Sequence, residues 1–304
     1  MTGWKALRVL GKGTYATVYL AIVAAPHQVN RQFIAAIKSS GSETFSALQK
    51  EENILRSLFD CEEIVQCFFS QFTLVHGSLN YNLIMEFAPH GSLRDLIIKR
   101  PLFAYEVRVY TRMLLNGLCC IHRMGVVHCD LKPDNILLYP SSDHCADYRV
   151  KIADFGISKT SDEIINTEFW KLRFRGTPLY MSPESVAMGQ ISSALDIWSL
   201  GCIVIEMVTR SPAWSNHITT EALMSKLVQK EAPNIREELG QDCKDFLSKC
   251  FVKDPNKRWT APMLLGHPFV TRHYDIFTGF ETQYSFYNSS SYFSYDMIAN
   301  GLMA

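Results

Sequence analysis

The sequence predicts an α+β fold of two lobes, a small β-rich N-terminal lobe with one helix and a larger, mainly helical C-terminal lobe. Three observations predict it. The chain has 304 residues, 47% of them hydrophobic, which is enough for a large core divided between two units. Apolar residues form short strand-like runs up to residue 85 and recur at helical spacing from residue 93. A stretch with Pro and Gly at 86–92 separates these patterns and predicts a connector.

Composition excludes several classes of function. The 30 basic and 30 acidic residues balance, which disfavours binding to nucleic acid or to an anionic membrane surface. The nine cysteines contain no Cys-x-x-Cys pair and predict reduced thiols in a cytoplasmic protein, with the nucleus left open as a second location. No apolar run approaches the roughly 18 residues of a membrane span, so no span is expected.

A glycine-containing turn joins the first two predicted strands. Glycine lets backbone N–H groups approach phosphate oxygens without interference from a Cβ atom. An ordinary hairpin has a similar composition, so the turn is weak evidence by itself. A strand follows it rather than a helix, which argues against a dinucleotide site. The turn and its flanks contain the candidate nucleotide-binding residues Gly11, Lys12, Gly13, Thr14, Tyr15, Ala16 and Val18.

Lys38 ends the apolar run 33–38, where an unpaired ammonium group would be costly to bury. The predicted helix at 44–58 carries Glu51 and Glu52 as possible partners. Apolar pairs at 64–65 and 68–69 and the run 83–85 extend the predicted sheet, giving five strands. Further along the chain, helices are expected at 93–99 and 105–124, the second ending before Gly125. An exposed turn is expected at 139–148, with Cys145 as a free thiol.

Two motifs concentrate the chemistry. Residues 128–137 read His-Cys-Asp-Leu-Lys-Pro-Asp-Asn-Ile-Leu, and one strand pair later residues 154–156 read Asp-Phe-Gly. The Asp130 carboxylate can accept a proton from a hydroxyl group, and Lys132 can reach a phosphoryl group in transfer. Asn135 and Asp154 offer hard oxygen ligands suited to Mg²⁺. A lone Asp-Phe-Gly is usually only a turn, but the two motifs together are specific.

With these motifs, residues 4–270 resemble a eukaryotic protein kinase domain. Lys132 and the run Gly-Thr-Pro-Leu-Tyr-Met-Ser-Pro-Glu at 176–184 are similar to the serine/threonine branch. The resemblance implies a bilobal protein kinase fold at 1–270, with an N-lobe at about 1–85, a hinge at 86–92, a C-lobe at 93–270 and a tail at 271–304. It also implies ATP and Mg²⁺ in the cleft, with adenine against the main chain of Glu86 and Ala88, and Met85 behind it.

The resemblance further assigns partners within the domain. It favours Glu51 over Glu52 as the partner of Lys38 and leaves Glu52 solvated. Thr177 is expected to order Asp130 and Lys132, and Asp196 to cap the backbone of the catalytic loop. Glu184 is expected to form a buried pair with Arg258, where Ser182 replaces the usual alanine of the motif.

Residues 176–185 and 196–202 resemble plant MEKK-like MAP kinase kinase kinases. This implies MAP kinase kinases as substrates, phosphorylated on serine or threonine in stress or hormone signalling, with regulatory protein partners. Two alternatives stay open, a serine/threonine kinase of another branch and a pseudokinase scaffold. The second is favoured only by Ala16, where glycine is usual, and by Cys129, where most kinases carry an arginine that binds activation-loop phosphate.

Two segments lead to separate expectations. Between Asp154 and Glu184, the possible phosphate acceptors are Thr160, Ser161 and Thr167, and the cations that could bind a phosphate are Lys171, Arg173 and Arg175. After His273, the tail has no Lys or Arg, three acids and nine Phe or Tyr residues, so partial disorder is expected. Docking of the tail to a partner or to its own domain is the alternative.

Overall fold

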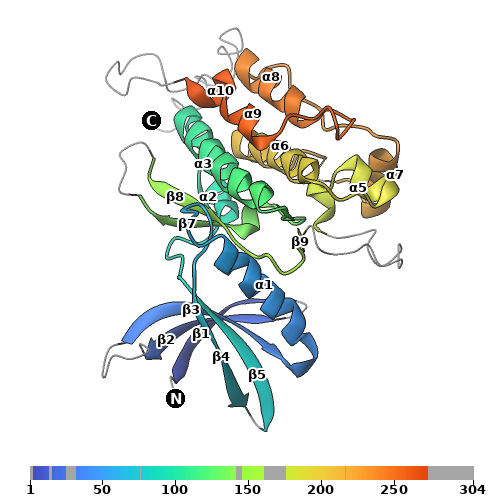
Figure 1. Ribbon diagram of the computed structural model, residues 1–304. Coiled ribbons are helices and arrows are strands. Elements are labelled where there is room, and N and C mark those ends of the chain that lie inside the picture. The colour runs from blue at the N-terminus through green and yellow to red at the C-terminus, as the bar shows by residue number, and fades with distance from the viewer. Residues whose placement is uncertain are drawn as a thin grey trace, which may run out of the picture.

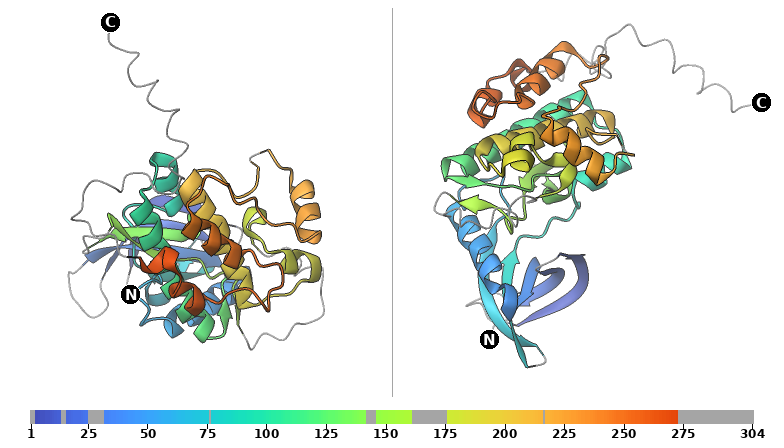
Figure 2. Two further views of the ribbon diagram at one scale, coloured as in Figure 1. Left: turned by 90° about the horizontal axis from the view of Figure 1, so that it is seen from above. Right: turned by 90° about the vertical axis from the view of Figure 1, so that its right-hand side faces the viewer.

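The computed structural model describes residues 3–13, 16–24, 32–75, 77–141, 146–160, 176–215 and 217–272. These residues form a lobe built on one sheet and a second, mainly helical lobe (Figures 1 and 2). The predicted two-lobed α+β architecture is confirmed. Outside the described residues lie the expectations for Thr14, Tyr15, Cys145, Ser161, Thr167, Lys171, Arg173, Arg175 and the tail from residue 273.

The first lobe contains a five-stranded antiparallel sheet in the order β1-β2-β3-β5-β4. Its strands are β1 Trp4–Lys12, β2 Thr17–Ala24, β3 Gln32–Gly41, β4 Cys67–Val75 and β5 Ser78–Met85. Small and β-branched residues fill its inner face, where Ala21, Ile37 and Ile84 are fully buried. The register pairs Val18 with Lys38, so the strand that follows the glycine turn runs beside the lysine.

One helix completes this lobe. After the short 3-10 helix η1 Ser42–Thr44, α1 Phe45–Ser57 packs on the sheet on the side of the second lobe (Figure 1). Leu48 and Leu55 are buried on its inner face. The prediction for residues 64–65 was wrong, because they lie outside the five-stranded sheet. Ile64 forms an isolated bridge with Ile152 of the second lobe instead. Apolar character alone does not say which strand a short segment will meet.

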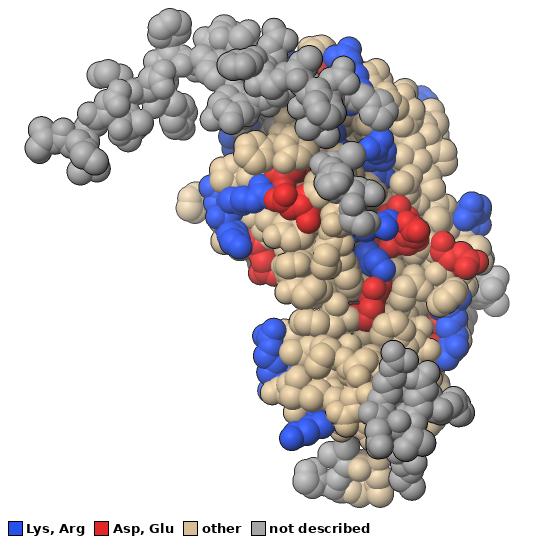
Figure 3. Space-filling view, turned by 90° about the vertical axis from the view of Figure 1, so that its left-hand side faces the viewer, with Lys and Arg blue, Asp and Glu red and all other residues tan. Residues whose placement is uncertain are grey.

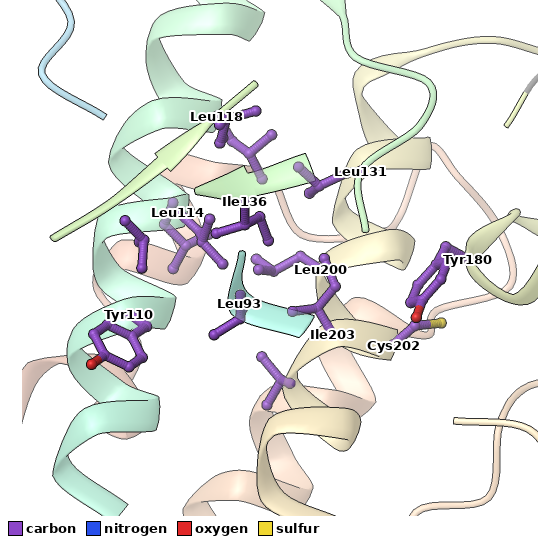
Figure 4. Packing of buried hydrophobic residues seen from close by; sticks show 14 of the residues in the cluster. Leu93, Tyr110, Leu114, Leu118, Leu131, Ile136, Tyr180, Leu200, Cys202 and Ile203 are labelled. Atoms are coloured by element: carbon purple, nitrogen blue, oxygen red, sulfur yellow. The ribbon is translucent and has the colours of Figure 1, made fainter. Parts of the chain in front are cut away.

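The second lobe is organised around α6 Ser193–Thr209, whose residues from Leu195 to Met207 are all buried. A helix that is buried on every side lies in the centre of a lobe, and its buried acids Asp196 and Glu206 then need partners. Tyr110 and Leu114 of α3 Ala104–Arg123 lie in the same cluster as Leu200 and Ile203 of α6 (Figure 4). The remaining helices are α2 Leu93–Lys99, α5 Pro183–Met188, α7 Thr220–Val228, α8 Gln241–Cys250, α9 Ala261–Leu265 and α10 Pro268–Thr271.

Local signals fix the ends of α2 and α3. The Ser92 hydroxyl accepts a hydrogen bond from the Asp95 N–H at 3.2 Å, and the Asp95 carboxylate accepts one from the Ser92 N–H at 2.8 Å. This reciprocal capping box starts α2 at the predicted residue. Gly125 follows α3 with φ 68°, a left-handed conformation that glycine adopts without steric cost.

Two pairs of short strands flank the loops that carry the two motifs. They are β6 Val126–Val127 paired with β9 Lys159–Thr160, and β7 Ile136–Pro140 paired with β8 Tyr148–Ile152. The exposed turn expected at 139–148 is therefore shorter than predicted, since Tyr139 lies in β7 and is buried. On the face of the helical lobe seen in Figure 3, Lys and Arg side chains lie among Asp and Glu, in keeping with the balanced composition.

Candidate active site

Asp196 of α6 binds the backbone of the loop between β6 and β7. The fully buried Asp196 carboxylate accepts hydrogen bonds from the N–H groups of His128 at 2.9 Å and Cys129 at 3.1 Å. His122 Nε2 lies 2.8 Å from the same carboxylate. Cys129 has φ 68°, which is uncommon for a residue with a side chain and needs support from its surroundings. The cap expected from the sequence is therefore present, and it fixes the backbone immediately before Asp130.

Asp130, Lys132 and Thr177 form one connected group. Lys132 Nζ lies 2.8 Å from Asp130 Oδ2 and donates to Thr177 Oγ1 at 2.8 Å. Both the hydroxyl and the backbone N–H of Thr177 donate to Asp130 Oδ1, each at 2.8 Å. The Asp130 side chain keeps 13% of its surface exposed, so the carboxylate is oriented by these contacts yet open to a further partner.

Gly176 lets the segment that carries Thr177 come this close. Its φ is 106°, and a Cβ atom at this position would lie 2.5 Å from the carbonyl oxygen of Cys129. Any other residue here would push the two segments apart. The Gly-Thr sequence at 176–177 is thus explained by steric fit against the loop that carries Asp130.

Lys38 lies between two carboxylates. Its Nζ donates to Glu51 Oε1 at 2.8 Å and Oε2 at 2.6 Å, and to Asp154 Oδ1 at 2.8 Å. Burial by itself would lower the pKa of Lys38, but the charges of Glu51 and Asp154 outweigh it and raise that pKa above its ordinary value. Burial by itself would raise the pKa of Asp154, but the charge of Lys38 outweighs burial and lowers the pKa of Asp154 below its ordinary value. Lys38 and Asp154 are therefore both charged at neutral pH.

The choice between the two glutamates of α1 agrees with the structure, but the expectation for the second one was wrong. Glu51 meets Lys38, while Glu52 is buried rather than solvated. The Glu52 carboxylate accepts hydrogen bonds from Ser70 at 2.8 Å and from the Tyr81 hydroxyl, and pairs with Arg56. A helix packed on a sheet buries more than one side of its surface, which helical spacing alone does not show.

The glycine turn and the connector border the same region. The Gly13 N–H donates to the Ala16 carbonyl at 2.9 Å and closes the turn between β1 and β2. In the connector, the Glu86 N–H donates to the Gln66 carbonyl at 3.0 Å, and the Glu86 carboxylate binds Lys151 Nζ at 2.6 Å. Within the described chain, no hydrogen bond uses the carbonyl of Glu86 or the main chain of Ala88.

The oxygen atoms near Asp130 suit a hard divalent cation. Asn135 Nδ2 donates to the Asp130 carbonyl at 2.9 Å and to Asp130 Oδ2 at 3.2 Å, which leaves Oδ1 as the free end of this amide. Asp154 has φ 67° and a side chain that is 49% exposed. The Ala153 N–H donates to the Asn135 carbonyl at 2.8 Å, so the two motifs are joined directly. One amide and one carboxylate oxygen fit Mg²⁺, which takes few protein ligands and completes its shell with phosphate and water.

The predicted pair between Glu184 and Arg258 is present. Arg258 Nη1 and Nη2 donate to the two Glu184 oxygens at 2.6 and 3.0 Å, and both side chains are buried. The guanidinium also donates to the carbonyls of Ala194 and Val252 and lies 5.0 Å from the centre of the Trp198 ring. The pair ties the segment after Thr177 to the last third of the chain.

Sequence reasoning missed a second charged group beside the loop. Arg94 of α2 meets Asp134, Tyr180 and Glu206, which come from three other elements. It also missed the contact of His122 with Asp196. The one feature of the sequence that pointed to the group around Arg94 was Asp134, an acid inside the 128–137 motif. Its partner could not be inferred from the sequence.

Two lobes joined by a connector, with a lysine–glutamate pair in one and an Asp-Lys-Asn loop in the other, define a phosphoryl-transferring kinase. The model of the protein kinase domain matches residues 4–270, and the chain belongs to the protein kinase family. Within that family it is a serine/threonine protein kinase, and its similarity to plant MAP kinase kinase kinases is confirmed.

Three similar curated relatives come from Arabidopsis thaliana. Mitogen-activated protein kinase kinase kinase 20 is 41% identical over 275 residues, covering 88% of this chain and 78% of the relative. Mitogen-activated protein kinase kinase kinase 17 is 39% identical, with 90% of this chain and 71% of the relative covered. Mitogen-activated protein kinase kinase kinase 18 is 36% identical, with 92% of this chain and 81% of the relative covered. Separately, no helix in the described ranges has the length and apolarity needed to cross a membrane.

Proposed function

We propose that this kinase is a MAP kinase kinase kinase that transfers the γ-phosphoryl group of ATP to serine or threonine hydroxyls of MAP kinase kinases. One observation carries the catalytic part of the proposal. The Asp130–Lys132–Thr177 group is assembled, and Asn135 and residue 153 join it to the segment that carries Asp154, whose carboxylate binds Lys38 of β3. The choice of substrate is supported by the names of the relatives.

Nucleotide binding follows from the free groups of the cleft. The Glu86 N–H is already bonded to Gln66, so its carbonyl is the group left to accept a hydrogen bond from adenine, with the Ala88 main chain beside it. Gly11, Lys12, Gly13 and Ala16 supply the turn that covers the phosphates, together with Val18 and the positions of Thr14 and Tyr15. Lys38, held by Glu51, lies where it can bind phosphate oxygens.

In the transfer step, Asp130 orients the substrate hydroxyl and accepts its proton as the new bond to phosphorus forms and ADP leaves. Lys132 and Lys38 stabilise the negative charge of the phosphoryl group. Asn135 and Asp154 would hold Mg²⁺, which supplies further neutralisation of phosphate charge when bound. Most of the catalysis is positioning and charge stabilisation, because the protein forms no covalent bond in this step.

Phosphate transfer from radiolabelled MgATP to a purified MAP kinase kinase tests the proposal, with Lys38→Met and Asp130→Asn proteins as comparisons. We expect the wild type to label the substrate on serine or threonine and both variants to lose at least a hundredfold in rate. Equal labelling by all three proteins would exclude the assigned roles and favour a scaffold without turnover. A panel of other kinase substrates separates this enzyme from other serine/threonine branches.

The wider setting belongs to the same proposal. It includes a role in stress or hormone signalling, regulatory protein partners and a cytoplasmic or nuclear location, of which the relatives' names support only the place in a mitogen-activated kinase cascade. The division into a kinase domain at 1–270, with lobes meeting at 86–92, and a tail at 271–304 is supported by the family match to residues 4–270. Proteolysis under native conditions would test that division, with cleavage expected after residue 270.

A further inference from the structure

A second charged group lies beside the catalytic loop, formed by Arg94, Asp134, Tyr180 and Glu206, here named the Arg94 cluster. Arg94 Nη2 lies 3.3 Å from Asp134 Oδ2 and donates to the Tyr180 hydroxyl at 2.5 Å. The Tyr180 hydroxyl donates in turn to Glu206 Oε2 at 2.7 Å. Arg94 also pairs directly with Glu206 Oε1. One guanidinium therefore serves two carboxylates and a phenol.

The cluster lies beside the residues that position the substrate hydroxyl in the proposed function. Asp134 is four residues after Asp130 in the catalytic loop, and Tyr180 is three residues after Thr177, which bonds to Asp130. Arg94 therefore contacts both the catalytic loop, through Asp134, and the segment that follows Thr177, through Tyr180. The Asp134 side chain is 50% exposed and that of Arg94 is 25% exposed, so residues next to the substrate hydroxyl can reach them.

Charge explains what Arg94 does there. Glu206 is 2% exposed, and an unpaired carboxylate at that depth would be strongly destabilising. Without Arg94, Glu206 and Asp134 would form an acidic pair open toward the substrate, suited to a substrate's lysine or arginine. With Arg94 in place, a basic substrate side chain would have to displace an internal guanidinium that already makes these hydrogen bonds.

We propose that Arg94 is a specificity-determining residue, because it fills from within the chain the acidic pair that would otherwise bind a basic residue of the substrate. The enzyme then gains no rate from a lysine or arginine near the phosphorylated hydroxyl. This inference rests on the proposed function, since it requires that a protein hydroxyl be phosphorylated at Asp130.

The test uses synthetic peptides in which each position within five residues of the acceptor serine carries either arginine or alanine. The measured quantity is the ratio of kcat/KM for the arginine peptide to that for the alanine peptide. For the wild type we expect ratios of about one or below at every position. For Arg94→Gln, which keeps a hydrogen-bond donor but removes the charge, we expect the ratio to rise roughly tenfold at one or more positions.

Arg100→Gln is the matched control. Arg100 caps the other end of α2, is 29% exposed, and pairs with the fully buried Glu106 at 2.6 Å. The substitution removes the same charge from the same helix and leaves the same kind of buried partner, but its partners Glu106 and Asp147 lie outside the catalytic loop. Its ratios should equal those of the wild type.

The double variant Arg94→Gln/Glu206→Gln removes the buried unpaired charge and so guards against misfolding of the single variant. It retains Asp134 alone, so its ratio should rise by a smaller factor, roughly threefold. A wild-type preference of fivefold or more for arginine, or unchanged ratios in both variants, would overturn the role of Arg94. If the wild type and the Arg100→Gln protein phosphorylate no peptide or protein, the proposed function fails instead.

Discussion

Thr177 adds to the direct contact between Lys132 and Asp130, since its hydroxyl bonds to both side chains. Thr177→Val removes these two hydrogen bonds but keeps the shape and the backbone N–H bond to Asp130. Hydrogen bonds to charged groups contribute about 1.5–3 kcal/mol, so we expect kcat to fall about tenfold to a hundredfold, with little change in KM for ATP. Thr177→Ser, measured in the same steady-state assay, should stay within about threefold of the wild type. An active valine variant would show that the backbone contact suffices.

Cys129 leads to a prediction about regulation. Its thiol is buried and donates to the Val127 carbonyl at 3.4 Å, so the position supplies no cation for a phosphate on the activation loop. We expect the enzyme to be active before phosphorylation. Initial rates after phosphatase treatment should fall by less than about tenfold, with mass spectrometry confirming that Thr160, Ser161 and Thr167 are bare.

A hundredfold loss, about 2.7 kcal/mol of transition-state stabilisation, would contradict that expectation. It would mean that another cation binds the phosphate, and Lys171, Arg173 and Arg175 would then be the residues to substitute.

At the scale of elements, α5 is joined to the last third of the chain by the buried pair of Glu184 and Arg258. Removing one member of a buried pair leaves the other charge uncompensated, which costs about 3–5 kcal/mol. We expect Arg258→Ala to lower the free energy of unfolding by at least this amount, because it also breaks the bonds to Ala194 and Val252. Urea unfolding followed by tryptophan fluorescence measures it.

The control is the exposed pair of Lys226 and Glu231, whose side chains are 43% and 42% exposed. Lys226→Ala should change the unfolding free energy by less than about 1 kcal/mol, since exposed ion pairs contribute little. Equal effects of the two substitutions would mean that burial of the Glu184–Arg258 pair has no energetic consequence.

At the scale of elements, the sequence predicts best where the signal is local. The start of α2 follows from the capping box at Ser92, and the end of α3 from Gly125. Non-local outcomes were not predictable in the same way. Ile64 was expected in the sheet but meets Ile152, and Glu52 was expected in solvent but meets β4 and β5. Both depend on which distant surface packs against the segment.

The candidate site shows the same division. The two motifs place Asp130, Lys132, Asn135 and Asp154 in one loop region because a short run of chain carries them. The Arg94 cluster draws on elements up to 112 positions apart in sequence, from Arg94 to Glu206, and no periodicity connects them. Residues that shape specificity are thus less visible in a single sequence than those that perform the chemistry.

For the whole molecule, the cysteines link packing to pH. None of the eight cysteines of the described chain is in a disulfide, and six of them are buried. Burial raises the pKa of Cys67 and Cys243 to about 12, and it also raises the pKa of Cys61, Cys202 and Cys250. A buried thiol with a raised pKa stays protonated and is a poor nucleophile.

These thiols should make the fold less stable in alkali. Below pH 9, the ordinary thiol pKa of 9.0, the folded and unfolded states bind the same protons and the full stability is present. Between pH 9 and about 12 these thiols lose protons only in the unfolded state, so stability falls as pH rises, by about 1.4 kcal/mol for each buried thiol at pH 10. The urea midpoint of unfolding should therefore be lower at pH 10 than at pH 8, and Cys243→Ala should reduce that difference by the contribution of one thiol.

At pH 8, iodoacetamide should modify the partly exposed Cys119 and Cys120 long before Cys202 or Cys250. Uniform labelling of all four thiols would show that the second lobe opens far more readily than its packing implies.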